Sequence, residues 1–337
     1  MNRQDLDFLK QNGYYKFPNI LQIEITKSCP LKCKQCYKPD NQNLHMEYSK
    51  LCKILDLING KCGAISLNGG EPLIYPSILT LLEKVASMEF NVYLYSSGFG
   101  LNKDICYIIK NSNNIHFYIS LNGSSNAINS LSRDGFEYSI NAMKLLSNNH
   151  IRYGVNWVAR HDNVKDFNKF LKLVNRYNAT YVSVVESRLT GKGYESSFLS
   201  KEDLILLSQI INNNANNTPL IMVDACFSKL TPLLSMKNKA IPIRCTAGLS
   251  RCAINYDFSF QPCTHLNYHE HFESIEEYWS ESPILNKVRL HRFKNGGLCS
   301  KCRYSTWCEP CRATDLNIYD DVNKYLEKCT QFEVIGV

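Results

Sequence analysis

The chain has 337 residues, a net charge of +7, 44% hydrophobic residues and 20% charged residues, a composition typical of a globular protein with one large domain and a smaller one. Its lysines and arginines form no run of five or more, so a nucleic-acid-binding surface is not expected. No apolar stretch reaches the ~18 residues of a membrane span, and the start lacks a signal-peptide layout, so we expect a cytoplasmic protein without a membrane partner.

Apolar, β-branched or aromatic runs alternate with helix-like stretches over the first half of the chain. The predicted strands are Ile20–Thr26, Ala64–Leu67, Asn91–Tyr95, Ile115–Leu121, Ile151–Val158 and Thr180–Val185. The predicted helices are Tyr48–Ile58, Ser77–Met88, Lys103–Lys110, Phe136–Ser147 and Val164–Tyr177. This alternation predicts an α/β protein with a parallel sheet. Because eight such units close a TIM barrel, six predict an open, partial (β/α)6 barrel with its site at the carboxyl ends of the strands.

After Glu186 this alternation stops, although Lys201–Asn212 reads as a helix and Leu220–Val223 as a short strand. Cysteines then become frequent. We therefore divide the chain into a short lead over residues 1–17, a partial barrel over 18–225, a linker over 226–244 and a cysteine-rich domain over 245–337.

Three cysteines lie close together in the sequence SCPLKCKQCY, just after the first predicted strand. Cys29, Cys33 and Cys36 have the spacing C-x3-C-x2-C. Fifteen cysteines in a reducing compartment favour metal ligation over disulfides. A [4Fe–4S] cluster normally takes four thiolates, so three leave one iron open to another ligand. The alternatives are a zinc knuckle and core cysteines, but zinc prefers four ligands in C-x2-C pairs.

This spacing resembles the signature of the radical S-adenosylmethionine (SAM) superfamily. The resemblance implies that the open iron is chelated by SAM, whose reductive cleavage gives a 5′-deoxyadenosyl radical that abstracts hydrogen. The segment NGGEP follows the second predicted strand and resembles the loop of that superfamily that holds the amino group of SAM. By this resemblance Gly69, Gly70 and Glu71 are assigned to SAM, and a tight turn before the next helix is equally compatible.

Two more strand ends carry polar residues that the resemblance assigns to SAM. Ser96 lies in SSG after the third strand, and Ser120 lies in ISLNG after the fourth, with Arg133 following. For Ser96 and Arg133, a structural turn or ion pair remains an alternative. The family's usual Asp is replaced by Asn122, and Gln35 replaces a frequent aromatic residue, so Gln35 is assigned to hydrogen-bond adenine.

Eight further cysteines resemble the SPASM domain, a C-terminal extension of radical SAM enzymes that carries two auxiliary clusters. Their number matches two fully ligated [4Fe–4S] clusters. The resemblance implies that Cys245, Cys252, Cys263 and Cys311 hold the first cluster, and that Cys299, Cys302, Cys308 and Cys329 hold the second. The chain departs from the family in its Cys308-x2-Cys311 spacing and in having Phe258 at a usual glycine. A pair of zinc sites is the alternative.

Taken together, the motifs resemble a peptide maturase with SAM and three [4Fe–4S] clusters, which acts on a ribosomally made precursor peptide and receives electrons from a flavodoxin or ferredoxin. One alternative is an anaerobic sulfatase maturase, although Thr264 stands where those enzymes carry an Asp. A small-molecule radical enzyme and a non-catalytic iron–sulfur electron carrier are the others. Cys52 and Cys106 are expected in the core. His265, His269 and His271 are expected in a solvated loop after Cys263, with a proton donor or acceptor among them as the alternative.

Overall fold

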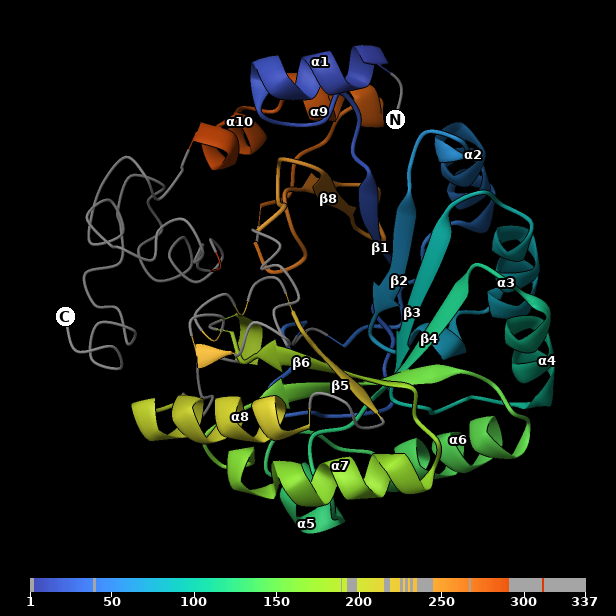
Figure 1. Ribbon diagram of the computed structural model, residues 1–337. Helices are drawn as coiled ribbons and strands as arrows, with labels where there is room; N and C mark the ends of the chain where they lie inside the picture. Colours follow the sequence, from blue (N-terminus) through green and yellow to red (C-terminus); the bar gives the residue numbers. More distant parts are fainter. Residues whose placement is uncertain are drawn as a thin grey trace.

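A nine-stranded sheet forms the centre of the protein, as seen in a computed structural model (Figure 1). The structure describes residues 3–38, 41–188, 190–192, 199–214, 219–224, 227, 230, 233–234, 245–266, 268–290 and 311. The strands are β1 (Ile20–Thr26), β2 (Ala64–Gly69), β3 (Asn91–Ser96), β4 (Ile115–Ser120), β5 (Tyr153–Ala159), β6 (Tyr181–Glu186), β7 (Leu220–Val223), β8 (Arg251–Ile254) and β9 (Phe260–Gln261). They are ordered β7-β6-β5-β4-β3-β2-β1-β8-β9, with β1 to β8 parallel and β9 antiparallel to β8.

Helices pack along the outer face of this curved sheet and bury the apolar side chains of the strands. The α-helices are α1 (Arg3–Asn12), α2 (Tyr48–Ile58), α3 (Ile78–Ala86), α4 (Lys103–Asn111), α5 (Asn126–Asn129), α6 (Phe136–Asn148), α7 (Phe167–Arg176), α8 (Lys201–Asn213), α9 (Ile275–Glu281) and α10 (Pro283–Leu290), with 3-10 turns at Pro72–Ile74 and Val164–Asp166. Helices α2, α3, α4, α6 and α7 follow the sheet from β1 to β6 (Figure 1). Among the described helices, none is both long and apolar enough to cross a membrane.

The predicted open barrel of six parallel strands is confirmed, with β7 and β8 added at its two sides. The predicted strand Ile151–Val158 begins two residues later, because His150 adopts a left-handed φ of 55° and Ile151 N donates to Leu146 O in the turn that ends α6. The predicted helix Val164–Tyr177 is divided, since its first turn is a 3-10 helix. The expected lead contains helix α1, which the sequence analysis missed.

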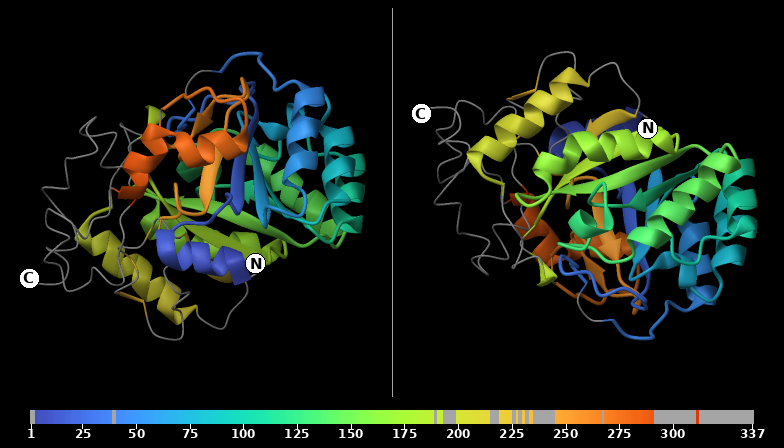
Figure 2. Two further views of the ribbon diagram at one scale, coloured as in Figure 1. Left: turned by 90° about the horizontal axis from the view of Figure 1, so that it is seen from above. Right: turned by 90° about the horizontal axis from the view of Figure 1, so that it is seen from below.

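The segment after residue 244 continues the sheet of the barrel. Strand β8 pairs with β1 from Ile20↔Arg251 to Ile23↔Ile254, and Figure 2 shows this orange segment beside the blue N-terminal part of the chain. Trp279 of α9 donates its indole N–H to Tyr15 O at 2.8 Å. The described part of the predicted second domain thus shares its sheet with the first. The division into domains at residue 245 stays a prediction.

The carboxyl ends of β1 and β2 lie in close backbone contact, which requires glycine. Gly70 N donates to Thr26 O and Glu71 N to Ser28 O, both at 2.8 Å. A Cβ on Gly70 would lie 2.2 Å from Ser28 O, and a Cβ on Gly69, whose φ is +146°, would lie 2.2 Å from Thr26 O. Neither site admits a side chain, so the two glycines fix the start of the cysteine loop against β2.

We expect Gly70→Ala to destabilise the protein by about 1–3 kcal/mol, because the new methyl group overlaps backbone atoms that cannot rotate away. The matched control is Gly60→Ala at the exposed end of α2, where a positive φ costs about 1 kcal/mol but the nearest contact is a flexible Glu89 side chain at 3.6 Å. Chemical denaturation measures both. If Gly70→Ala lost no more free energy of unfolding than Gly60→Ala, the cysteine loop would be free to move away from the new methyl group.

Candidate active site

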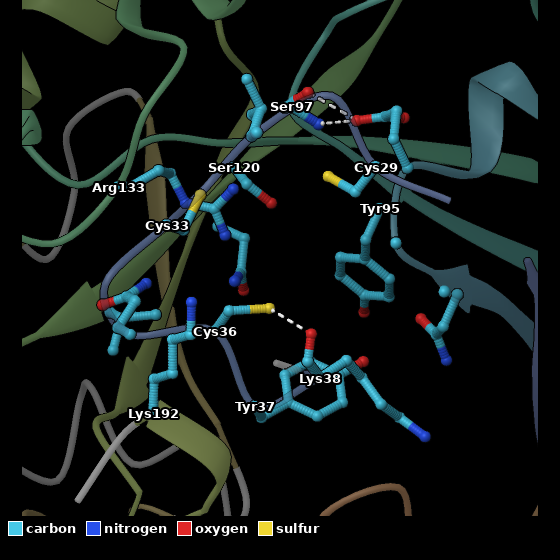
Figure 3. Close-up of a pocket in the computed structure, with 18 of the residues that line it drawn as sticks. Cys29, Cys33, Cys36, Tyr37, Lys38, Tyr95, Ser97, Ser120, Arg133 and Lys192 are labelled. Carbon is cyan, nitrogen blue, oxygen red and sulfur yellow. Dashed lines mark hydrogen bonds between the residues drawn. The ribbon is translucent and has the colours of Figure 1, made fainter. Parts of the chain in front are cut away.

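A cavity of about 550 Å³ opens at the carboxyl ends of the strands. Each strand from β1 to β6 contributes to its wall, either from its last residues or from the loop that follows it. Figure 3 shows Cys29, Cys33 and Cys36 arranged around this space, with Ser120 and Arg133 beside Cys33. The three cysteines that the sequence analysis singled out therefore line one cavity, at the expected end of the barrel.

Main-chain hydrogen bonds from neighbouring loops hold the cysteine loop in place. Cys29 N donates to Asn41 Oδ1 at 2.9 Å. Two further amides donate to the loop after β4. Lys32 N donates to Asp134 Oδ2 at 2.8 Å, and Gln35 N donates to Ser132 O at 3.2 Å. The segment after β6 closes the other side, where Lys192 N donates to Cys36 O at 3.0 Å. The thiols are thus positioned by the barrel as a whole.

The three thiols fit an iron–sulfur cluster better than a single metal ion. Burial raises the pKa of Cys29 to about 11 and raises that of Cys36, so bound metal would have to displace their protons. In the described part of the chain, no group of three His, Cys, Asp or Glu converges closely enough to bind one metal ion. In a [4Fe–4S] cluster each thiolate binds a different iron, which suits this wider arrangement. Arg133 and Lys192 favour the Cys36 thiolate.

Glu71 lines the cavity, but its carboxylate is only 1% exposed and is bonded within the protein. Oε1 accepts from Ser96 Oγ at 2.7 Å and from Leu73 N at 3.2 Å. Oε2 accepts from Ser97 N at 2.8 Å and Ser97 Oγ at 2.5 Å. These four bonds use the acceptor capacity of a carboxylate. Burial raises the pKa of Glu71 and the hydrogen bonds oppose that rise, so its evident role is to join β2 to β3.

The two predicted serines have different surroundings. The Ser96 hydroxyl donates to Glu71 and accepts from Gly98 N at 2.8 Å, so it is part of the brace between β2 and β3. This matches the structural alternative for Ser96, although the residue also lines the cavity. Ser120 ends β4 and lines the cavity beside Arg133, as expected (Figure 3).

Within the described residues, the cavity-lining side chains of Gln35 and Arg133 each carry a buried polar atom without a hydrogen-bond partner. These atoms are Gln35 Oε1, an acceptor, and Arg133 Nε, a donor. A buried polar group without a partner costs about 1–3 kcal/mol, so such atoms mark places where a polar ligand fits. The adenine, ribose and carboxylate groups of SAM offer both donors and acceptors. The residues of this cavity therefore fit SAM, and both atoms belong to residues that the sequence analysis had assigned to it.

The far wall of the cavity contains residues that the sequence analysis missed. His265 was expected in a solvated loop, but it lines the cavity and its ring lies 4.6 Å from that of Tyr37. That expectation was wrong because the segment after Cys263 brings the imidazole against Tyr37 and within 3.2 Å of Thr190 Oγ1. Burial lowers the pKa of His265 well below its usual value and Arg188 adds to the shift, so the imidazole is neutral. The three histidines after Cys263 have no periodic spacing that predicts which of them lies at the cavity.

Of the eight C-terminal cysteines, the structure describes four. Cys245, Cys263 and Cys311 pack in one cluster, whereas Cys252 belongs to the main core. The others, Cys299, Cys302, Cys308 and Cys329, lie outside the described residues. Phe258 has a φ of 66°, so it takes the left-handed conformation that glycine adopts readily. Its departure from the SPASM pattern therefore changes the residue without preventing the turn.

Comparisons with known proteins agree with this fold and site. Residues 23–174 match the sequence profile of the radical SAM superfamily. The mycofactocin maturase MftC of Mycobacterium ulcerans is 22% identical over 310 residues, which cover 86% of this chain and 82% of that protein. The homologous maturase of Mycobacterium tuberculosis is 21% identical over 305 residues, covering 86% and 77%.

Solved structures share the fold at lower identity. Streptococcus suis SuiB bound to S-adenosylmethionine superposes with a TM-score of 0.79 at 18% identity, covering 94% of this chain and 78% of SuiB. The anSMEcpe structure with AdoMet and the Cp18Cys peptide gives 0.72 at 17% identity, covering 94% and 96%. The cysteine loop, the cavity and the sequence match agree that residues 23–174 form a radical SAM domain, the domain of enzymes that use SAM and a [4Fe–4S] cluster.

Proposed function

We propose that this enzyme is a radical SAM/SPASM peptide maturase that abstracts hydrogen from a ribosomally made precursor peptide. The observation that carries the proposal is the placement of two three-thiol groups, Cys29, Cys33 and Cys36 in the cavity and a second group close to its far wall. Cys263 of the second group acts electrostatically on Tyr37, a cavity residue. A substrate held in the cavity would thus lie between one catalytic and one auxiliary cluster.

The catalytic thiols would hold a [4Fe–4S] cluster with one iron left for the methionine end of SAM. When bound, the cluster supplies the electron that cleaves SAM. The residues of the cavity would position the bound cofactor and shield it from solvent. Gly69, Gly70 and Glu71 would form the wall at the methionine end, with Glu71 acting through the serines that it braces. Gln35 and Arg133 would use their unpaired atoms to orient the bound cofactor.

Several features support a peptide as the substrate. The sequence relatives are mycofactocin maturases, and solved structures of the same fold include SuiB bound to the precursor peptide SuiA and anSMEcpe bound to a peptide. The cavity extends past the thiols to charged groups of its far wall, which include Lys38, ion-paired with Glu24 at 2.9 Å, and Arg188, ion-paired with Asp224 at 3.0 Å. Such groups can bind main-chain amides and charged side chains of an extended chain. We also propose two auxiliary clusters on the C-terminal cysteines, and a flavodoxin or ferredoxin as electron donor in the cytoplasm.

The cluster assignment predicts the iron content. Anaerobically reconstituted protein should contain about twelve irons, and a Cys29→Ala/Cys33→Ala/Cys36→Ala variant about eight, since only the catalytic cluster is lost. With dithionite and SAM, the variant should form no 5′-deoxyadenosine. Cys106→Ala is the matched control, because this thiol lies buried in α4 and should leave both values unchanged. Zinc instead of iron, or no deoxyadenosine from the unmodified protein, would refute the assignment.

The brace around Glu71 predicts the effect of Glu71→Gln. The amide nitrogen would face a backbone N–H of Ser97 or Leu73, which leaves one buried donor unpaired and costs about 1–3 kcal/mol. SAM affinity, measured by equilibrium binding to reconstituted protein, should fall as the wall loosens. Ser97→Ala should shift affinity in the same direction by less. Glu89→Gln on the exposed surface serves as control. If Ser97→Ala had no effect, Glu71 would act on SAM directly.

The peptide proposal predicts transfer of hydrogen from substrate to cofactor. Short peptides encoded beside the gene, synthesised with deuterated side chains and α-carbons, should yield deuterated 5′-deoxyadenosine and a product of altered mass or stereochemistry. Mass spectrometry measures both. If deoxyadenosine formed without deuterium from any such peptide, but acquired it from a small metabolite, the substrate class would be wrong while the radical chemistry remained.

A further inference from the structure

Three C-terminal thiols share one small cluster of buried residues. Cys245 is 5% exposed and Cys311 is 6% exposed, and both pack with Leu266 and Val288, with Cys263 against them. Thiols from three separate segments are therefore gathered at one place, as a shared cluster requires.

The fourth predicted ligand, Cys252, lies elsewhere. It is 0% exposed in β8 and is paired in register with Leu21 of β1. It belongs to the main core, and the groups that act on its thiol are Cys62 and Arg289. Tyr278 of α9 also interacts with it. No thiol of the three-cysteine group is among the groups that act on Cys252.

The alternation of side chains along β8 explains this separation. Successive residues of a strand point to opposite faces of the sheet. Ala253 is paired in register with Gln22 of β1, and the Gln22 Oε1 accepts from Thr264 N, the residue after Cys263, at 3.4 Å, which places the three-cysteine group on the face of Gln22 and Ala253. Cys252 precedes Ala253 and so points to the opposite face, where it packs in the main core. Bringing its thiol to Cys263 would require turning β8 over, which its four-residue pairing with β1 prevents.

We propose that Cys252 is a core residue and not an iron ligand, and that the first auxiliary site is built from three thiols, Cys245, Cys263 and Cys311. The proposal rests on the auxiliary cluster of the proposed function and changes its ligand set. The fourth iron of such a cluster takes its ligand from a group other than Cys252. Within the described residues, the remaining cysteines Cys52, Cys62 and Cys106 do not belong to the three-cysteine group.

Cysteine alkylation of the unmodified protein tests this directly. Native reconstituted protein is treated with iodoacetamide before and after removal of iron with ferricyanide and EDTA, and each cysteine is followed by peptide mass spectrometry. Cys263, the partly exposed thiol of the three, should become alkylated only after iron removal. Cys252 should stay protected in both states, because the fold and not iron shields it. Iron-dependent alkylation of Cys252 equal to that of Cys263 would overturn the proposal.

Variants give an independent measurement. Cys252→Ala and Cys252→Val should keep the iron and sulfide content of the unmodified protein, since both side chains suit an apolar strand position. Cys263→Ala should lose about four irons. Loss of four irons from either Cys252 variant that remains folded by circular dichroism would overturn the proposal. If instead the unmodified protein held only about four irons, the auxiliary clusters of the proposed function would fail, whatever the Cys252 variants showed.

Discussion

The cysteine loop of this enzyme contains no helix or strand, and its position depends on hydrogen bonds of its main chain, one to a residue later in the segment after β1 and the others to segments that follow β4 and β6. These partners include Asn41, Asp134 and Ser132 for the amides and Lys192 for the carbonyl of Cys36. A loop held in this way is ordered only when β1, β4 and β6 are in place together. The thiol positions are therefore a property of the folded barrel, which explains how so short a segment can present three ligands around one cavity.

Other parts of the cavity wall are also held by hydrogen bonds within the protein, made by polar side chains that line or adjoin the cavity. The Glu71 carboxylate accepts hydrogen bonds from Ser96, Ser97 and Leu73, and these bonds connect the end of β2 to the end of β3. In contrast to the fully hydrogen-bonded carboxylate of Glu71, Gln35 Oε1 and Arg133 Nε have no hydrogen-bond partner among the described residues. They mark where the protein leaves hydrogen-bonding capacity for a bound molecule, in a frame that needs little rearrangement to accept it.

Much of this organisation could be predicted from the sequence, because strands and helices leave periodic patterns and cluster ligands leave spacings. The barrel and the cysteine loop were predicted in this way. The inward position of His265 was not, since a single residue in a turn carries no pattern. The face of Cys252 was also hidden, because β8 has four residues and three consecutive ones are buried, so no alternation between buried and exposed positions marks its faces. Similarly, the glycine-like turn at Phe258 is visible only in its φ of 66°.

The pairing of β8 with β1 also covers one edge of the barrel sheet. Without the segment after residue 244, the backbone groups of Ile20 to Ile23 that pair with β8 would form a free edge of a parallel sheet. Leu21 and Ile23, both fully buried, would lose the cover of β8 and α9. A free apolar edge of this kind pairs readily with other chains. The cysteine-rich segment thus protects the barrel against aggregation, independently of any metal that it binds.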